Sequence, residues 1–176
     1  AALLIARLEY PRLDASVYLT KLDQLGEAAA ERIAALGEDA DPMTRITELS
    51  SYLFKDQAFV GNRNNYDDPR NSFLNEVIDR RTGIPITLAL VYIEVARRAD
   101  VDIDGVNFPG HFLLKVPAHP NATLSSDDQV IVDPFHGGAV LSESDRQNLL
   151  RKHAGEEAAF DRRLLSRATK QEILVR

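Results

Sequence analysis

The segment from Pro85 to Ala99 constrains the fold of this chain more than any other. Its apolar residues cover most of the circumference of a helix, not one stripe of it, and Glu94 is its only acid. A helix that is apolar all round has to be covered on every side by other elements. We therefore predict a buried central helix, around which the rest of the chain packs.

Start and stop signals predict the other helices. Asp14, Asp41 and Asp68 offer N-caps, and proline follows two of them at the first helical position. Gly37 and Gly83 end the predicted segments, and Ser142-x-x-Asp145 resembles a capping box. The predicted helices cover residues 1–9, 14–36, 41–54, 68–83 and 142–153.

Short strands are predicted after the central helix. They cover residues 105–108, 111–116, 129–133 and 139–141, and the polar segment 117–128 reads as a hairpin loop. In the second strand Phe112 and Leu114 share one face, while His111 and Leu113 share the other. Helices first and strands later favour an α+β domain over a doubly wound one.

Composition limits the function classes. The chain has 176 residues, 44% of them hydrophobic, which suits one soluble domain with a substantial core. Its net charge of −6 disfavours binding to nucleic acid. The run from Ile84 to Ile93 is far shorter than the ~20 residues that span a bilayer, so we expect no membrane association. The chain has no cysteine, which is compatible with a cytoplasmic protein and excludes thiol catalysis and disulfides.

A group of segments together resembles a known family. They are Phe59-Val60-Gly61-Asn62, Asp68-Pro69-Arg70-Asn71-Ser72, Arg80-Arg81-Thr82-Gly83-Ile84-Pro85-Ile86, Glu94-Val95-Ala96-Arg97-Arg98, Phe108-Pro109-Gly110-His111-Phe112 and Asp133-Pro134-Phe135-His136-Gly137-Gly138. The pattern resembles the transglutaminase-like superfamily of the papain-like fold and, more closely, the bacterial SirB family. The resemblance implies an α+β core with N-terminal helices and a buried central helix packed on an antiparallel sheet.

The resemblance also implies where a catalytic site would lie. Active members start the central helix with Gly-x-Cys, and that cysteine works with a strand histidine and an aspartate. On this chain the glycine is Gly83, the histidine His111 and the aspartate Asp133, while Pro85 takes the cysteine position. Proline removes both the thiolate nucleophile and a backbone N–H that commonly helps to bind an oxyanion. The expected site is thus a remnant His111–Asp133 dyad.

The resemblance further implies a division of the chain. Residues 1–165 would form the transglutaminase-like domain with its N-terminal helical region. Residues 166–176, which carry the capping signal Thr169-x-x-Glu172, would begin a further helical region, for which the resemblance implies repeats of the tetratricopeptide type.

Other polar residues beside the predicted helix start are cleft candidates. Thr87 could replace the nucleophile, but it points away from the direction of Pro85, and a hydroxyl bonded to the preceding turn is the favoured interpretation. The asparagine-rich loop supplies Asn62 and Tyr66, and Asn71 follows it. These residues either form local turns and caps or provide donors to a cleft.

His136 could add a third ligand to His111 and Asp133, and two histidines with a carboxylate suit zinc. The three show no metal-type spacing in the sequence, so we predict no metal and no cofactor.

Two functions remain open. The first is a non-catalytic domain or scaffold that binds a protein or peptide. The second is a hydrolase or transferase that uses His111 and Asp133 with a water, a hydroxyl or a metal. Neither the partner nor the oligomeric state follows from the sequence.

Overall fold

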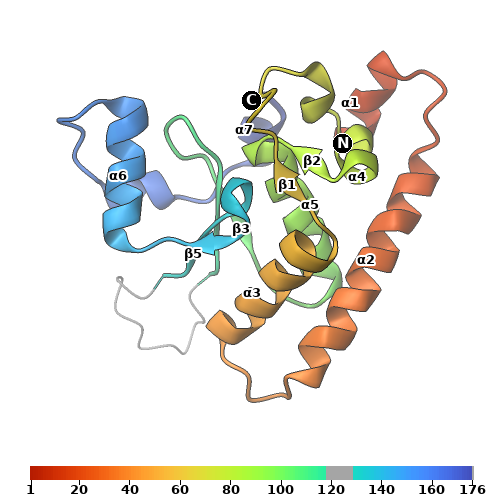
Figure 1. Cartoon of the computed structure of the whole chain (residues 1–176), viewed down its shortest axis with the longest axis horizontal. Coiled ribbons are helices and arrows are strands. Elements are labelled where there is room, and N and C mark those ends of the chain that lie inside the picture. The colour runs from red at the N-terminus through yellow and green to blue at the C-terminus, as the bar shows by residue number, and fades with distance from the viewer. Residues whose placement is uncertain (118–128, 176) are drawn as a thin grey trace.

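The computed structural model describes residues 1–117 and 129–175 and shows an α+β domain (Figure 1). The predicted hairpin loop at 117–128 lies almost entirely outside the described residues. The α-helices are α1 (Ala2–Glu9), α2 (Ala15–Ala35), α3 (Pro42–Ser51), α4 (Leu74–Arg80), α5 (Pro85–Arg98), α6 (Glu143–Ala154) and α7 (Lys170–Val175). Single turns of other helix types are η1 (Tyr52–Asp56), η2 (Pro69–Ser72), η3 (Pro134–His136) and η4 (Arg162–Leu165).

The predicted caps are present. The Asp14 carboxylate accepts a hydrogen bond from Ser16 N at 2.9 Å, and Asp41 accepts one from Thr44 N at 3.0 Å. Ser142 and Asp145 form the reciprocal bonds of a capping box at the start of α6. Each cap satisfies a backbone N–H that has no partner within its helix.

One predicted helix is divided. The segment 68–83 contains the 3-10 turn η2 and then α4, with Phe73 in extended conformation between them. The segment is divided because of the cap at Asp68. Its side chain accepts a hydrogen bond from Arg70 N and so caps only the short turn η2, after which the chain bends. Helix α4 ends at Arg81, which adopts a left-handed conformation with φ of 56°.

Two sheets are formed by strands of two or three residues. A four-stranded antiparallel sheet has the order β3 (Asp104–Val106), β4 (Leu113–Lys115), β5 (Ile131–Asp133) and β6 (Ala139–Val140). A parallel pair joins β1 (Val60–Gly61) to β2 (Thr82–Gly83), and the sequence did not predict it. The strands of the larger sheet are shorter than predicted, and His111 precedes β4 instead of belonging to it.

The larger sheet separates two hydrophobic clusters. Leu114 and Val132 belong to the main core with α2, α3, α4 and α5, whereas Leu113 and Ile131 belong to a smaller cluster with Leu150 of α6. Figure 1 shows α6 on one side of the sheet and the other long helices on the opposite side. The predicted alternation of faces is therefore confirmed.

Helix α5 lies at the centre of the main core, as its sequence predicts. Most of its side chains are buried, including Tyr92, whose hydroxyl is within 2.9 Å of Ser50 Oγ and within 3.2 Å of the Ile46 carbonyl. Helix α2 packs along α5, and η3 and α4 also contact it. This placement fixes the start of α5 relative to the sheet.

Candidate functional site

Asp133 is the centre of a buried polar cluster at the end of β5. Its Oδ1 accepts hydrogen bonds from Phe135 N at 2.9 Å and from His136 N at 3.2 Å, so its side chain caps η3. Pro134 suits the first position of this turn because it has no N–H to satisfy. The residue is 2% exposed, and its orientation is therefore fixed by backbone bonds as well as by its side-chain partners.

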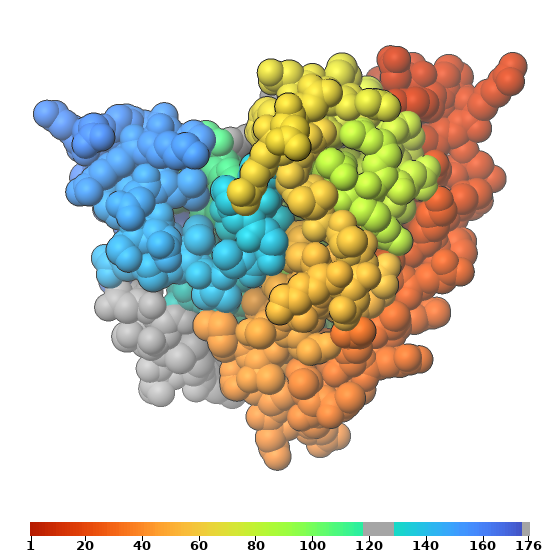
Figure 2. Space-filling view, viewed as in Figure 1, coloured from red at the N-terminus to blue at the C-terminus, as the bar shows by residue number. Residues whose placement is uncertain are grey.

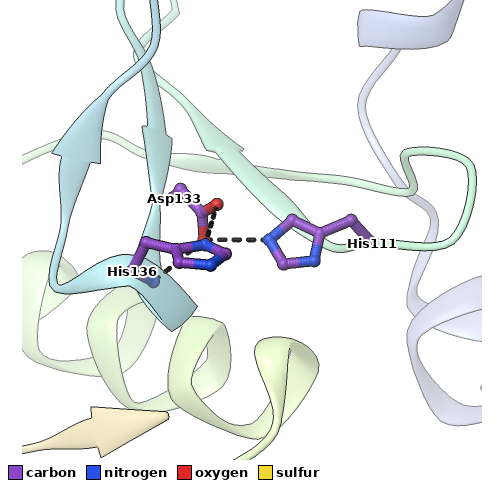
Figure 3. A group of neighbouring side chains, drawn as sticks. All are labelled: His111, Asp133 and His136. Carbon is purple, nitrogen blue, oxygen red and sulfur yellow. Dashed lines mark hydrogen bonds and ion pairs between the residues drawn. The ribbon is translucent and has the colours of Figure 1, made fainter. Parts of the chain in front are cut away.

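His111 donates from Nε2 to Asp133 Oδ1 at 2.9 Å (Figure 3). His111 is 5% exposed. It follows a turn at Gly110, where φ is +66°. A glycine is needed there, because a Cβ would also come within 2.4 Å of the His153 ring. The structure thus brings the two predicted dyad residues together, although His111 reaches Asp133 from a turn and not from a strand.

Two further histidines complete the cluster. His136 donates from Nδ1 to Asp133 Oδ2 at 2.7 Å, and its side chain is 40% exposed. His153, from the last turn of α6, stacks on His111 with ring centroids 6.3 Å apart and planes 17° apart. The sequence does not predict a role for His153, because no local pattern links it to a residue so far along the chain.

The cluster keeps Asp133 ionised. Burial raises the pKa of Asp133, but hydrogen bonds and charge interactions with His111 and His136 outweigh it, so the pKa lies below its usual value. A carboxylate only accepts hydrogen bonds, which places the protons on His111 Nε2 and on His136 Nδ1.

The start of α5 has no nucleophile. Pro85 is buried at the first helical position, after the N-cap Ile84. The Thr87 hydroxyl donates to the Asn71 carbonyl at 2.8 Å and accepts from Ile84 N at 3.1 Å. Thr87 therefore has the local structural role that was favoured for it, with Asn71 as an additional partner.

Asn71 also holds the asparagine-rich loop. It is fully buried, and its Nδ2 donates to the carbonyls of Asn65 and Tyr66, at 2.9 and 3.1 Å. Its Oδ1 accepts from Asn62 Nδ2 at 3.1 Å. Asn62 and Asn71 thus form local hydrogen bonds within the loop, which agrees with the first of the two interpretations.

Tyr66 connects the loop to the histidine cluster. Its ring lies edge-to-face against Phe135, with centroids 5.8 Å apart, and Phe135 lies 6.1 Å from His111 in the same manner. In Figure 2 the yellow atoms of this loop lie against the cyan atoms of η3. Tyr66 remains 47% exposed, so this aromatic contact is open to solvent.

The turn η3 connects the two parts of the expected site, which are the start of α5 and the cluster around Asp133. This turn packs against α5 and against β1, which pairs with β2, and β2 ends two residues before Pro85. At Gly61 of β1 a Cβ would lie 2.5 Å from the Phe135 carbonyl oxygen, so only glycine permits the close approach. Figure 3 shows His111, Asp133 and His136 grouped above helical ribbon.

A family model matches nearly the whole chain. The model of the transglutaminase-like superfamily matches residues 16–176. This chain belongs to the transglutaminase-like superfamily. Its α+β architecture agrees with that assignment, and the absence of cysteine means that this superfamily domain lacks a catalytic thiol.

Curated relatives extend beyond this chain. A UPF0162 protein of Xylella fastidiosa is 42% identical over 99% of this chain, and the matched part is 60% of that protein. A UPF0162 protein of Pseudomonas aeruginosa is 32% identical over the whole chain and 60% of its own length. The F-box only protein 21 of Mus musculus is 37% identical over 62% of this chain and 18% of its own length. This chain therefore spans about 60% of the length of these two bacterial relatives.

No solved structure matches the chain. Among residues 1–117 and 129–175, none of the helices has both the length and the apolar composition needed to cross a membrane.

Proposed function

We propose that this transglutaminase-like domain is non-catalytic and binds a protein or peptide segment. The observation that supports the proposal most strongly is Pro85 at the start of α5, in a chain without cysteine. The neighbouring Thr87 hydroxyl already donates a hydrogen bond to the Asn71 carbonyl and accepts one from Ile84 N. A nucleophile and an oxyanion donor are both missing from the position where the superfamily has them.

The surface that would bind the segment is the aromatic patch of Tyr66, Phe135 and His136. Tyr66 and His136 are about half exposed and flank the Phe135 ring. Rigid rings with a polar tip favour binding, because they bury apolar area at a small cost in conformational entropy. The proposed ligand is an extended peptide with an apolar side chain for Phe135 and a hydrogen-bond acceptor or donor near His136.

The proposal includes a place for the domain in a larger protein. We place it in the SirB family and in the cytoplasm, with residues 166–176 at the start of a further helical region of the tetratricopeptide type. Support comes from the segments that resemble SirB proteins and from the cap that Thr169 and Glu172 form before α7. A binding domain beside helical repeats would act as a scaffold.

Peptide selection tests the binding function. A displayed library of random peptides would be selected on the purified chain, and the enriched peptides measured against Tyr66→Ala and against Leu8→Ala. Leu8 is the matched control because it is an exposed apolar residue on α1. We expect Tyr66→Ala to weaken binding at least about five-fold and Leu8→Ala to leave it unchanged. An absence of enriched peptides, or equal affinities for both variants, would contradict the proposal.

A second candidate is a hydrolase or transferase in which His111 acts as a base towards a water or hydroxyl. The specific observation in its favour is the 2.9 Å bond between His111 Nε2 and a buried carboxylate, which orients the ring. Amine-incorporation, peptidase and esterase assays test it. Turnover that disappears in both His111→Ala and Asp133→Asn would support this candidate and remove the non-catalytic proposal.

A further inference from the structure

The group His111, Asp133 and His136 has the composition of a zinc site. Each residue offers one ligand atom, and the three atoms all lie within 4.8 Å of one another. Figure 3 shows the two rings converging on one carboxylate. We propose that this cluster binds a single zinc ion through His111 Nε2, an Asp133 carboxylate oxygen and His136 Nδ1. The proposal goes beyond the binding function above and does not depend on it.

The hydrogen bonds of Asp133 indicate which oxygen faces the ion. Oδ1 already accepts from Phe135 N and His136 N in addition to His111. Oδ2 accepts only from the His136 ring among the bonds within the described residues. Oδ2 has fewer hydrogen bonds than Oδ1 and is therefore the ligand oxygen, while the backbone N–H groups on Oδ1 fix the carboxylate as hydrogen-bonded partners commonly do in metal sites.

Charge is the second argument. Asp133 is a buried carboxylate, and both of its ion-pair partners in the described part of the chain are histidines. Neither partner is a lysine or an arginine, whose side chains carry a lasting positive charge. Buried charges are ordinarily paired or coordinated to a metal. A divalent ion would supply the positive charge that neither lysine nor arginine provides here.

The geometry requires a small adjustment only. Zinc bonds of about 2.0–2.2 Å in a tetrahedral site place neighbouring ligand atoms roughly 3.3–3.5 Å apart. His111 and Asp133 are held by burial, whereas the half-exposed His136 ring can shift, because its 2.7 Å contact with Asp133 Oδ2 has to widen to that spacing. Each coordinating nitrogen has to give up its proton before it can bind the ion.

Zinc is favoured over iron and manganese by the burial of two of the three ligands. Two histidines and one carboxylate also form the facial triad of iron enzymes, but those sites need further open positions. Here His111 and Asp133 are almost fully buried, and the exposed side of His136 leaves access from one direction. Three protein ligands and one water complete a four-coordinate zinc site.

Titration calorimetry on the metal-free chain without an affinity tag tests the site. We expect one zinc ion per chain and a rise in the melting temperature with added zinc. His136→Ala should weaken binding at least about ten-fold, because it removes a ligand from a half-exposed position and leaves the buried dyad in place. Cobalt(II) should give the visible absorption of a four-coordinate site in the wild type and not in His136→Ala.

His153→Gln is the matched control, since it changes a histidine that stacks on His111 but lies outside the group of three. It should bind zinc with unchanged stoichiometry and with affinity within about two-fold of the wild type. The proposal is overturned by an absence of zinc binding, by tighter binding of iron(II) or manganese(II), or by loss of binding in His153→Gln with retention in His136→Ala. No substrate is involved, so each result is independent of the peptide and activity assays.

Discussion

The start of α5 and the histidine cluster are two halves of one expected site, and they differ in chemistry. At the start of α5, Pro85 and Thr87 leave neither a thiol nor a free hydroxyl. Around Asp133, three histidines gather from η3, the turn at Gly110 and the end of α6. One half has lost its reactive groups, whereas the other is densely polar.

The comparison of the two halves shows which residues the fold needs and which residues only catalysis would need. The helix start needs a residue that fits its first position, and proline meets that need without a reactive group. Asp133 has structural bonds of its own, because it caps η3 and joins it to the turn at Gly110. The hydrogen bonds of Asp133 stabilise the fold whether or not a nucleophile is present. The presence of the histidine cluster therefore does not establish an activity.

The largest expected effect is that of Asp133→Ala. This change removes the acceptor for two backbone N–H groups and for two histidine rings. The free energy of unfolding should fall by about 3 kcal/mol, since buried charged hydrogen bonds are lost together. Urea unfolding measures the change. His136→Ala is the comparison variant and should cost less than about 1 kcal/mol, and equal losses would refute a central role for Asp133.

The next effect concerns the loop beside the helix start. Asn71→Ala removes three side-chain hydrogen bonds and leaves the Asn65 and Tyr66 carbonyls without that donor. We expect a loss of about 2 kcal/mol in unfolding free energy and faster proteolysis between Asn62 and Tyr66. Asn64→Ala, at an exposed position of the same loop, should change stability by less than about 0.5 kcal/mol. A loss as large for Asn64→Ala would show that the loop is not held by Asn71.

Pro85→Cys tests directly whether the two halves face each other. A thiol beside an imidazole has a lowered pKa and reacts faster. At pH 6 its alkylation by iodoacetamide should be about ten-fold faster than in the Pro85→Cys/His111→Ala double variant. Val60→Cys, on an exposed strand position, gives the rate of an unassisted thiol. Equal rates with and without His111 would mean that the helix start and the cluster do not form one site.

The smallest effect is expected at Thr87. Thr87→Val removes the hydroxyl that joins Ile84 N to the Asn71 carbonyl. Stability should fall by about 1 kcal/mol, as measured by thermal or urea unfolding, while Thr87→Ser should retain most of it. If Thr87→Ser were as destabilised as Thr87→Val, the contribution of Thr87 to stability would come from packing of its methyl group and not from its hydrogen bonds.

Local signals in the sequence determined much of the fold. The caps at Asp14, Asp41 and Ser142 and the buried helix from Pro85 follow from side-chain chemistry within a few residues, which is why their positions were predictable. The division of the segment 68–83 was missed because a cap shows where a turn begins and not how many turns follow. The parallel pairing of β1 with β2 was not predictable, because two residues are too few to show the alternation of apolar and polar side chains that marks a strand.

From the residues alone it follows that the chain has no thiol, and the resemblance to the superfamily predicts His111 and Asp133 as a dyad. The contacts of His136 and His153 with this pair, and of Tyr66 with Phe135, are visible in the folded chain alone. Residue type and spacing fix what a side chain can do along its own element. The packing of α6 and the loop 62–67 around η3 fixes which side chains meet, because contacts between distant segments depend on how every element between them is placed.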